Sequence, residues 1–394
     1  MSASPRPARA VIVTFGQIVP PSGGIAVRSV MEARCLDGMG LAVQVLSVGE
    51  SDPAPDRGHL GVLATAEVPG LPDGVELTAL PSRPLFALGA GARRSLRSAI
   101  ARSDVVLVES ALLLPAVVLA GPRRPIVWDT TELETLHYSR LPTSPSVLLK
   151  CSVWYLLERW STRKVDVVMA ISAVEARHWA RLFPGTREKL MVADHAVLRE
   201  PRPAAQHLER ERSASVVFVG DLRAKHNYAA AKWTLEHLLP VLAGRARLVM
   251  AGPGTDDMAA DSPDVELLGF VADVSEVLAR AQVCIAPLLA GAGVKTKMLD
   301  YVRQGCRVLA TPVAMEGIED CPGVTVASLG EFPEALLGLL DTPEDAEQTA
   351  SRQVAQAKWY EEHCGQAHLI EQWTAILERV GLPAGYGRVS PPVA

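Results

Sequence analysis

The sequence lacks the residue patterns that mark several classes of protein. It has no D-x-D, no HExxH and no Cys/His cluster, so we expect no protein-bound metal. Its six cysteines form no CxxC pair and several lie in apolar runs, which indicates buried thiols of a reducing cytoplasm rather than disulfides. Its net charge of −5 argues against a nucleic-acid-binding protein, which would normally be basic.

Long uninterrupted hydrophobic runs are also missing. The longest apolar segment, which begins at Val105, contains Glu109 and Pro115 and is too short to span a bilayer. Near the amino terminus, Gly16 and Gln17 break an apolar run that would otherwise be typical of a signal peptide. We therefore expect a cytoplasmic protein, and the sequence leaves contact with a membrane surface open.

What the chain does contain is an alternation of strand-like apolar runs and helical stretches. This alternation predicts an α/β protein with parallel sheets covered by helices on both faces. We expect a Rossmann-like domain over 1–198, a charged linker over 199–214, a second Rossmann-like domain over 215–352 and a terminal helix over 353–394 that crosses back to the first domain. Two doubly wound domains of this kind are expected to face a central cleft, with ligands beyond the carboxyl ends of the strands.

Glycines follow several of the predicted strands. In "PLLAGAGVKTKMLDYVRQG", residues 287–305, two glycines precede Lys295, Lys297 and Asp300. A glycine loop that opens a helix lets backbone N–H groups approach an anion, and lysines add positive charge. Taken alone, this segment is equally consistent with a solvated helix start. Further along the strand ends, Asn227 is expected to cap a helix.

A dinucleotide-dependent dehydrogenase also pairs two such domains and is a remote alternative. The segment "GPGTDD" (252–257) has the first two glycines of G-x-G-x-x-G but carries Asp257 in place of the third. The loop after the first strand, "GQIVPPSGG", is too long for the tight turn of that motif. We therefore expect no NAD and no other cofactor.

From about Ser215 to Gly317 the sequence resembles the carboxyl-terminal domain of retaining GT-B glycosyltransferases of family 4, also called group 1. The matching pieces are "VVFVGDLRAKHN", "RLVMAGPG" and "VELLGFVADVSEVLARAQVCIAPLLAGAGVKTKMLDYVRQGCRVLATPVAMEGIE". The first half matches more weakly, in "PPSGGIAVRSV" and "VDVVMAISAVEARHW". The resemblance implies a metal-independent, hexosyltransferase-type enzyme that moves a sugar from a UDP- or GDP-sugar to a hydroxyl or amine acceptor with retention.

The resemblance also implies roles for individual residues. Lys297 takes the place of the lysine in G-x-G-x-R-x-K-x-x-E that contacts the donor diphosphate, and Arg223 and Lys225 resemble basic residues near the same phosphates. These three are the catalytic candidates. Asp300 stands at the second acid of the E-x7-E motif, which binds ribose, although Ala292 replaces the first acid. The other implied donor-binding residues are Gly23, Gly24, Gly220, Gly269, Phe270, Val271, Gly291, Gly293, Val294 and Lys295.

The acceptor side carries fewer signals. Members of the family often place a histidine after the strand that corresponds to "PIVWD", but here the strand ends at Asp129 and is followed by Thr130, Thr131 and Glu132. His195 stands where the family usually has N-G. Asp129, Glu132 and His195 are candidates for binding a small-molecule, glycan or lipid-linked acceptor, while capping of a strand or helix is an equal alternative for the two acids. A nucleotide-sugar epimerase relative or a non-catalytic GT-B protein remains the alternative function.

Overall fold

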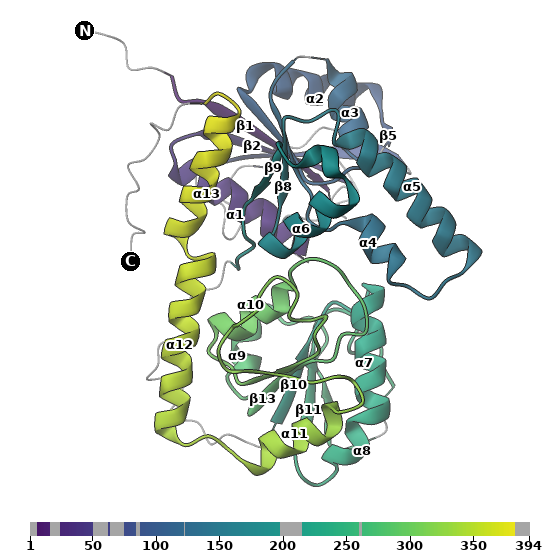
Figure 1. Cartoon of the computed structure of the whole chain (residues 1–394), viewed down its shortest axis with the longest axis vertical. Helices are drawn as coiled ribbons and strands as arrows, with labels where there is room; N and C mark the ends of the chain where they lie inside the picture. The colour runs from purple at the N-terminus through teal and green to yellow at the C-terminus, as the bar shows by residue number, and fades with distance from the viewer. Residues whose placement is uncertain are drawn as a thin grey trace. The chain divides into compact units, whose positions relative to one another are not determined.

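The computed structural model describes residues 6–15, 24–49, 62–63, 75–83, 87–121, 123–197, 215–259 and 262–382. The chain forms two compact units: unit 1 comprises Met1–Leu198 with Cys364–Ala394, and unit 2 comprises Arg199–His363 (Figure 1). The segment 199–214, predicted as a linker, lies outside the described residues.

Unit 1 is built on a sheet of nine strands in which the central strands are parallel. The strand order is β3-β4-β2-β1-β6-β7-β8-β9, and β5 pairs with β4. Only β3 and β5 run antiparallel to their neighbour among these pairings. The strands are β1 (Arg9–Phe15), β2 (Ala42–Gly49), β3 (Val62–Leu63), β4 (Glu76–Arg83), β5 (Ala87–Leu88), β6 (Val105–Val108), β7 (Ile126–Asp129), β8 (Val167–Ala170) and β9 (Leu190–Val192).

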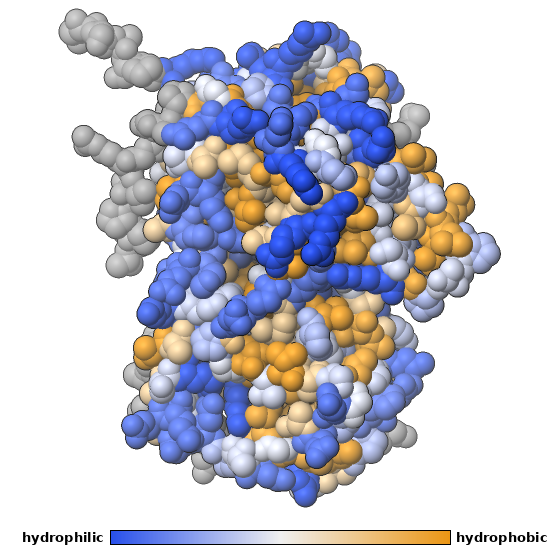
Figure 2. Space-filling model, in the orientation of Figure 1, coloured by the Kyte–Doolittle hydropathy of each residue, from blue (hydrophilic) through white to orange (hydrophobic). Residues whose placement is uncertain are grey.

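Helices of unit 1 follow the strands as the alternation of patterns predicts. They are α1 (Gly24–Gly38), α2 (Ala90–Arg102), α3 (Leu114–Ala120), α4 (Glu134–Ser139), α5 (Pro145–Ser161), α6 (Ala173–Leu182), the 3₁₀ helix η3 (Pro184–Thr186) and α13 (Gln366–Arg379). Ser172 caps α6 by accepting a hydrogen bond from the Glu175 N–H. In the core, the rings of Trp128 and Trp179 meet edge to face at 5.0 Å. On the face seen in Figure 2, apolar surface gathers over α5.

Unit 2 contains a parallel sheet of six strands in the order β12-β11-β10-β13-β14-β15. The chain moves outward from β10 in one direction and then returns to β13 on its other side, which is the doubly wound arrangement. The strands are β10 (Ser215–Val219), β11 (Arg247–Ala251), β12 (Val265–Leu267), β13 (Val283–Ala286), β14 (Val308–Ala310) and β15 (Val324–Val326), and the helices are α7 (Lys225–His237), α8 (Leu239–Leu242), α9 (Val274–Leu278), α10 (Thr296–Arg303), α11 (Phe332–Asp341) and α12 (Ala346–Cys364). The prediction of an α/β chain with two doubly wound sheets is confirmed.

The terminal helical segment differs from the single helix that the sequence pattern predicts. Two helices are present: α12 begins at Ala346, and α13 begins at Gln366. Between them Gly365 has extended backbone, with φ −68° and ψ 158°, which interrupts the helical hydrogen bonding. Among the described residues, no helix is both long enough and apolar enough to cross a bilayer.

Candidate functional site

The carboxyl ends of β10 and β11 approach each other so closely that the residue after β11 must be glycine. Gly252 has a φ of +130°, and a Cβ there would lie 2.2 Å from the carbonyl oxygen of Gly220. The Gly220 N–H donates to Ala251 (2.9 Å), and the Gly252 N–H donates to Gly269 (2.8 Å). A Cβ on Gly269 would in turn lie 2.9 Å from the Asp256 carboxyl carbon. Three glycines thus follow one another along this edge of the sheet.

Lys297, in the first turn of α10, reaches this same edge. Its Nζ donates to Oδ1 of Asn227 at 2.7 Å and lies 4.4 Å from the ring centre of Phe218. A Cβ on Gly220 would lie only 3.0 Å from that Nζ, so the glycine leaves room for the lysine. Burial, together with the nearby charge of Lys295, lowers the pKa of Lys297 to about 7. The structure therefore brings Gly220 and Lys297 together, and Asn227 is the hydrogen-bond partner of the lysine.

Lys295 has a different environment. It is buried, and its Nζ donates to the carbonyl oxygens of Ala292 and Gly293, each at 2.6 Å. Gly291 and Gly293 have φ values of +141° and +67°, which L side chains rarely adopt. Lys295 thus supports the glycine loop that precedes α10.

The remaining predicted donor-side residues are divided between unit 2 and, for Gly23 and Gly24, the part of the sequence that belongs to unit 1. Arg223 is exposed, and its guanidinium binds the Asp221 carboxylate, with Nη2 to Oδ2 at 2.6 Å. Lys225 is the exposed first residue of α7. Asp300 is buried on α10 and Phe270 is 63% exposed after β12. Val271 and Val294 are half-buried, Gly24 begins α1, and Gly23 lies outside the described residues.

Asn227 was not predicted to be part of a site. The structure places it inside the first turn of α7, which starts two residues earlier at Lys225, with Ala224 at the N-cap. Its Nδ2 donates to the Asp221 carbonyl oxygen at 3.0 Å, and this bond turns Oδ1 toward Lys297. The expectation that Asn227 caps the helix is therefore wrong. The one available signal is its position seven residues after a strand-ending glycine.

In unit 1, the structure reveals a buried cluster of charges around Arg28 of α1. Arg28 Nε lies 2.9 Å from Asp129 Oδ2 and 3.2 Å from Glu32 Oε1. Its Nη1 and Nη2 donate to the carbonyl oxygens of Asp194 (2.7 Å) and Ala193 (2.8 Å). Burial alone would lower the pKa of Arg28, but the Asp129 and Glu32 carboxylates raise it above its usual value. The guanidinium therefore stays charged and joins α1 to the ends of two strands.

Two further carboxyl groups belong to this cluster. Burial and the Asp129 charge raise the pKa of Glu109 to about 7, and the Ser29 hydroxyl donates to Glu109 Oε2 at 2.6 Å. The same two causes raise the pKa of Glu32 well above its usual range. One guanidinium thus faces three buried carboxyl groups, those of Asp129, Glu32 and Glu109. No local sequence pattern revealed this cluster, although Glu109 interrupts an apolar run.

The predicted acceptor residues all lie in unit 1, near this cluster in the sequence. Asp129 is fully buried and paired with Arg28. Glu132 is half-buried, with its Oε1 2.9 Å from Nδ1 of His137. His195 is buried, and burial together with the Arg28 charge lowers its pKa to about 3, so the imidazole is neutral.

Helix α13 contacts the chain after β9. The Asp194 carboxylate accepts a hydrogen bond from Gln372 Nε2 at 2.7 Å and lies 2.9 Å from His368 Nε2. Gln372 Oε1 accepts in return from the Asp194 N–H at 2.8 Å. These bonds hold the position where the family usually has N-G.

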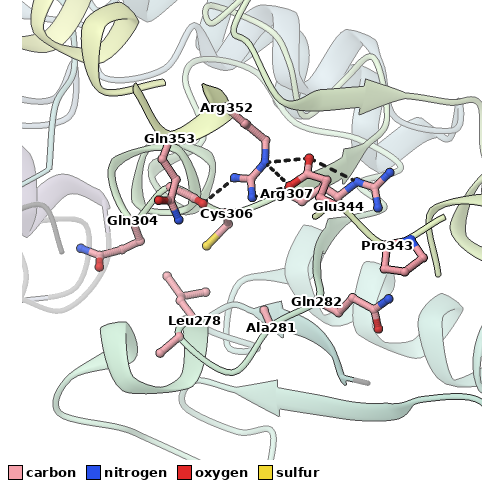
Figure 3. A pocket seen from close by; sticks show the side chains of 12 residues that line it. Leu278, Ala281, Gln282, Gln304, Cys306, Arg307, Pro343, Glu344, Arg352 and Gln353 are labelled. Atoms are coloured by element: carbon pink, nitrogen blue, oxygen red, sulfur yellow. Dashed lines mark hydrogen bonds and ion pairs between the residues drawn. The ribbon is translucent and has the colours of Figure 1, made fainter. Parts of the chain in front are cut away.

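A cavity of about 160 Å³ lies at the opposite edge of the unit 2 sheet, where Gln282 and Arg307 immediately precede β13 and β14. Glu344 lies between two arginines, 2.9 Å from Arg352 Nη2 and 3.8 Å from Arg307 Nε (Figure 3). The two arginines and one glutamate are the charged residues of the wall, and Glu344 offsets only part of the positive charge of the arginines. In the part of the chain that the structure describes, no group of three or more His, Cys, Asp or Glu side chains is arranged to hold a metal ion.

Comparisons with known proteins match both units. A family model for the glycosyl transferase 4-like domain matches residues 23–193, and one for glycosyl transferases group 1 matches residues 213–342. No curated protein sequence matches this chain.

Several solved structures share the fold. Sucrose-phosphate synthase from Thermosynechococcus elongatus is 12% identical, with a TM-score of 0.70 over 94% of this chain and 99% of that one. HepE from Anabaena, solved in complex with UDP and glucose, is 15% identical, with a TM-score of 0.65 over 93% and 99%. The α,α-trehalose 6-phosphate synthase from Burkholderia multivorans is 13% identical, with a TM-score of 0.65 over 95% and 97%.

Proposed function

We propose that this chain, which belongs to the GT-B glycosyltransferases of the group 1 and 4-like families, moves a sugar from a nucleotide-sugar donor to a hydroxyl or amine acceptor. The donor would be a UDP- or GDP-sugar bound at the carboxyl edge of the unit 2 sheet. The anomeric configuration would be retained, and no metal would be needed. A nucleotide-sugar donor is supported by the fold shared with HepE, which was solved with UDP and glucose.

The observation that carries this proposal is the position of Lys297 at the glycine-lined ends of β10 and β11. When the bond between sugar and diphosphate breaks, negative charge grows on the departing phosphate oxygens. A cation and N–H dipoles fixed in advance at that point stabilise the transition state more than the bound donor. Lys297 is fixed in this way by Asn227 and Phe218, and the loop glycines allow a phosphate to approach the backbone.

The lowered pKa of Lys297 fits such a role. A lysine with a pKa of about 7 is only partly charged when the site is empty. A bound diphosphate would favour the charged form and draw a proton onto Nζ. The lysine would then carry its full charge when donor is present, which is when the leaving group needs it.

A ligand panel tests the donor class directly. We expect UDP or GDP to raise the thermal stability of the protein and NAD to leave it unchanged. A ligand at about 100 times its Kd adds roughly 2.7 kcal/mol of stability. Stabilisation by NAD alone would instead support the dehydrogenase alternative.

Product analysis tests the reaction class. Incubation with donor alone should leave the sugar configuration unchanged, whereas an epimerase would convert it. Transfer should also continue in EDTA, because Lys297 supplies positive charge at the diphosphate. Activity that disappears in chelator and returns only with magnesium or manganese would overturn the metal-independent proposal.

A further inference from the structure

Helix α5 of unit 1 presents an apolar face to solvent. Four of its large hydrophobic side chains are more than half exposed: Leu148 (56%), Leu149 (66%), Val153 (54%) and Leu156 (64%). Their spacing of i, i+1, i+5 and i+8 places them on one side of the helix. Figure 2 shows apolar surface over α5. We call these four residues the α5 apolar face.

The opposite side of α5 is fixed in unit 1, so the apolar face cannot rotate inward. Glu158 is buried, and its carboxyl accepts hydrogen bonds from the Glu134 N–H at 2.9 Å and from the Thr135 hydroxyl. The ring of Tyr155 stacks on that of Phe183 with centres 5.2 Å apart. The helix is therefore a rigid support for the exposed leucines and valine.

Basic side chains outnumber acidic ones in the segment that contains α5. Residues 138–165, all of which the structure describes, contain five basic side chains, and the one acidic side chain among them, Glu158, is buried. The basic residues are Arg140, Lys150, Arg159, Arg163 and Lys164, and each is exposed. The whole chain carries a net charge of −5, so this surface has the opposite sign to the protein as a whole.

We propose that α5 binds the surface of a bilayer that contains anionic phospholipids. Apolar side chains rimmed by lysine and arginine match the interface between acyl chains and negatively charged headgroups. The leucines and Val153 would enter the boundary of the acyl chains, and Lys150 and Arg159 would contact phosphates. A second copy of the chain is a poor occupant, because pairing two such faces would bring five basic groups against five.

Co-sedimentation with vesicles tests this proposal without donor or acceptor. We expect binding to vesicles of phosphatidylcholine with phosphatidylglycerol, decreasing as salt increases, and weak binding to phosphatidylcholine alone. The double variant Leu149→Gln/Leu156→Gln should lower the fraction bound by about tenfold or more, because two leucines no longer leave water. Val354→Gln is a matched control, because Val354 is 70% exposed on α12, outside the α5 apolar face. This variant should bind vesicles as the wild type does.

A second variant, Lys150→Glu/Arg159→Glu, tests the charge independently and should abolish the preference for anionic vesicles. No binding to anionic vesicles at low salt, or equal binding by both double variants and the wild type, would overturn the proposal. Wild-type self-association in sedimentation velocity that Leu149→Gln/Leu156→Gln removes, without vesicle binding, would show instead an interface between copies. Sugar transfer to a water-soluble acceptor is measured separately, so failure here leaves the proposed function standing.

Discussion

The Nζ atom of Lys297 lies 2.7 Å from Oδ1 of Asn227, and this hydrogen bond joins the first turn of α10 to the first turn of α7. The two residues are 70 positions apart in sequence. Because Asn227 is itself held by the Asp221 carbonyl, the bond fixes the lysine at the end of β10 even when the site is empty. A charge held in place before the reaction is the form of catalytic contribution that depends least on reorganisation.

Replacing Lys297 should affect the chemical step more than donor binding. Lys297→Ala is expected to lower kcat by roughly 10²–10³-fold, as removal of one preorganised donor does, with a smaller change in the KM for the donor. Steady-state kinetics with varied donor will separate the two. Lys232→Ala is the control, since Lys232 is exposed on α7 and pairs only at 3.6 Å with Glu236. A near-normal kcat in Lys297→Ala would contradict this role of Lys297, and the diphosphate contact would then be assigned to Arg223 and Lys225.

Donor binding should be linked to proton uptake by the same lysine. The free site has a Lys297 pKa of about 7, and a bound diphosphate raises it, so the protein takes up a proton on binding above pH 7. The affinity for UDP or GDP should therefore fall as pH rises from about 7 to 9. Calorimetry in buffers of different ionisation enthalpy will count the protons. Lys297→Met should lose the uptake; equal uptake in this variant would assign the proton to another group.

Gly252→Ala should destabilise the protein strongly. Its Cβ would lie 2.2 Å from the Gly220 carbonyl oxygen, and the φ of +130° is unfavourable for alanine. Backbone strain and displacement of the strand end should together lower the free energy of unfolding by about 2 kcal/mol or more. Urea unfolding will measure this change. The control is Gly338→Ala in α11, where nothing lies within 4 Å and alanine should stabilise by about 0.5–1 kcal/mol. Unchanged stability in Gly252→Ala would mean that the two loops separate easily.

Removal of the buried Arg28 cation of unit 1 should lower the free energy of unfolding, and the size of this loss should depend on pH. Arg28→Met leaves the Asp129, Glu32 and Glu109 carboxyls buried without a cation, which typically costs about 3–5 kcal/mol. Burial already raises the pKa values of Glu32 and Glu109 in the folded protein, and loss of the guanidinium charge would raise them further above their unfolded values, so the stability of the variant falls as pH rises. Urea unfolding should show a larger loss at pH 8 than at pH 5. Arg94→Met, an exposed arginine of α2, should change little at either pH.

The strand pattern and the glycine positions made the fold and the carboxyl edge of unit 2 predictable. Runs such as "VVFV" and "VCIA" are apolar because those strands are covered on both faces, and this is visible in the sequence alone. The contacts of Lys297 were not predictable, because Asn227 was expected to begin a helix that in fact starts two residues earlier. A shift of that size changes which way an asparagine side chain points.

The cluster around Arg28 was not predicted from the sequence, for a different reason. Arg28 and Glu32 are four residues apart on α1, which alone resembles an ordinary pair on a solvated helix face. Their partners Glu109 and Asp129 lie at the ends of two separate strands, about 80 and 100 positions further along the chain. Only the order of strands in the sheet brings these groups together, and no spacing within one segment encodes that order.

The pairing of Asp194 with α13 has a consequence for how the chain folds as it is synthesised. The partners of Asp194, His368 and Gln372, follow it by 174 and 178 residues. Unit 2 lies between them and is complete at His363, before α13 has been made. Domains usually fold in the order in which the ribosome releases them. Here unit 1 is the first to be synthesised, but α13, its last helix, is made only after unit 2. Unit 1 can therefore complete its fold only after the whole of unit 2 has been synthesised.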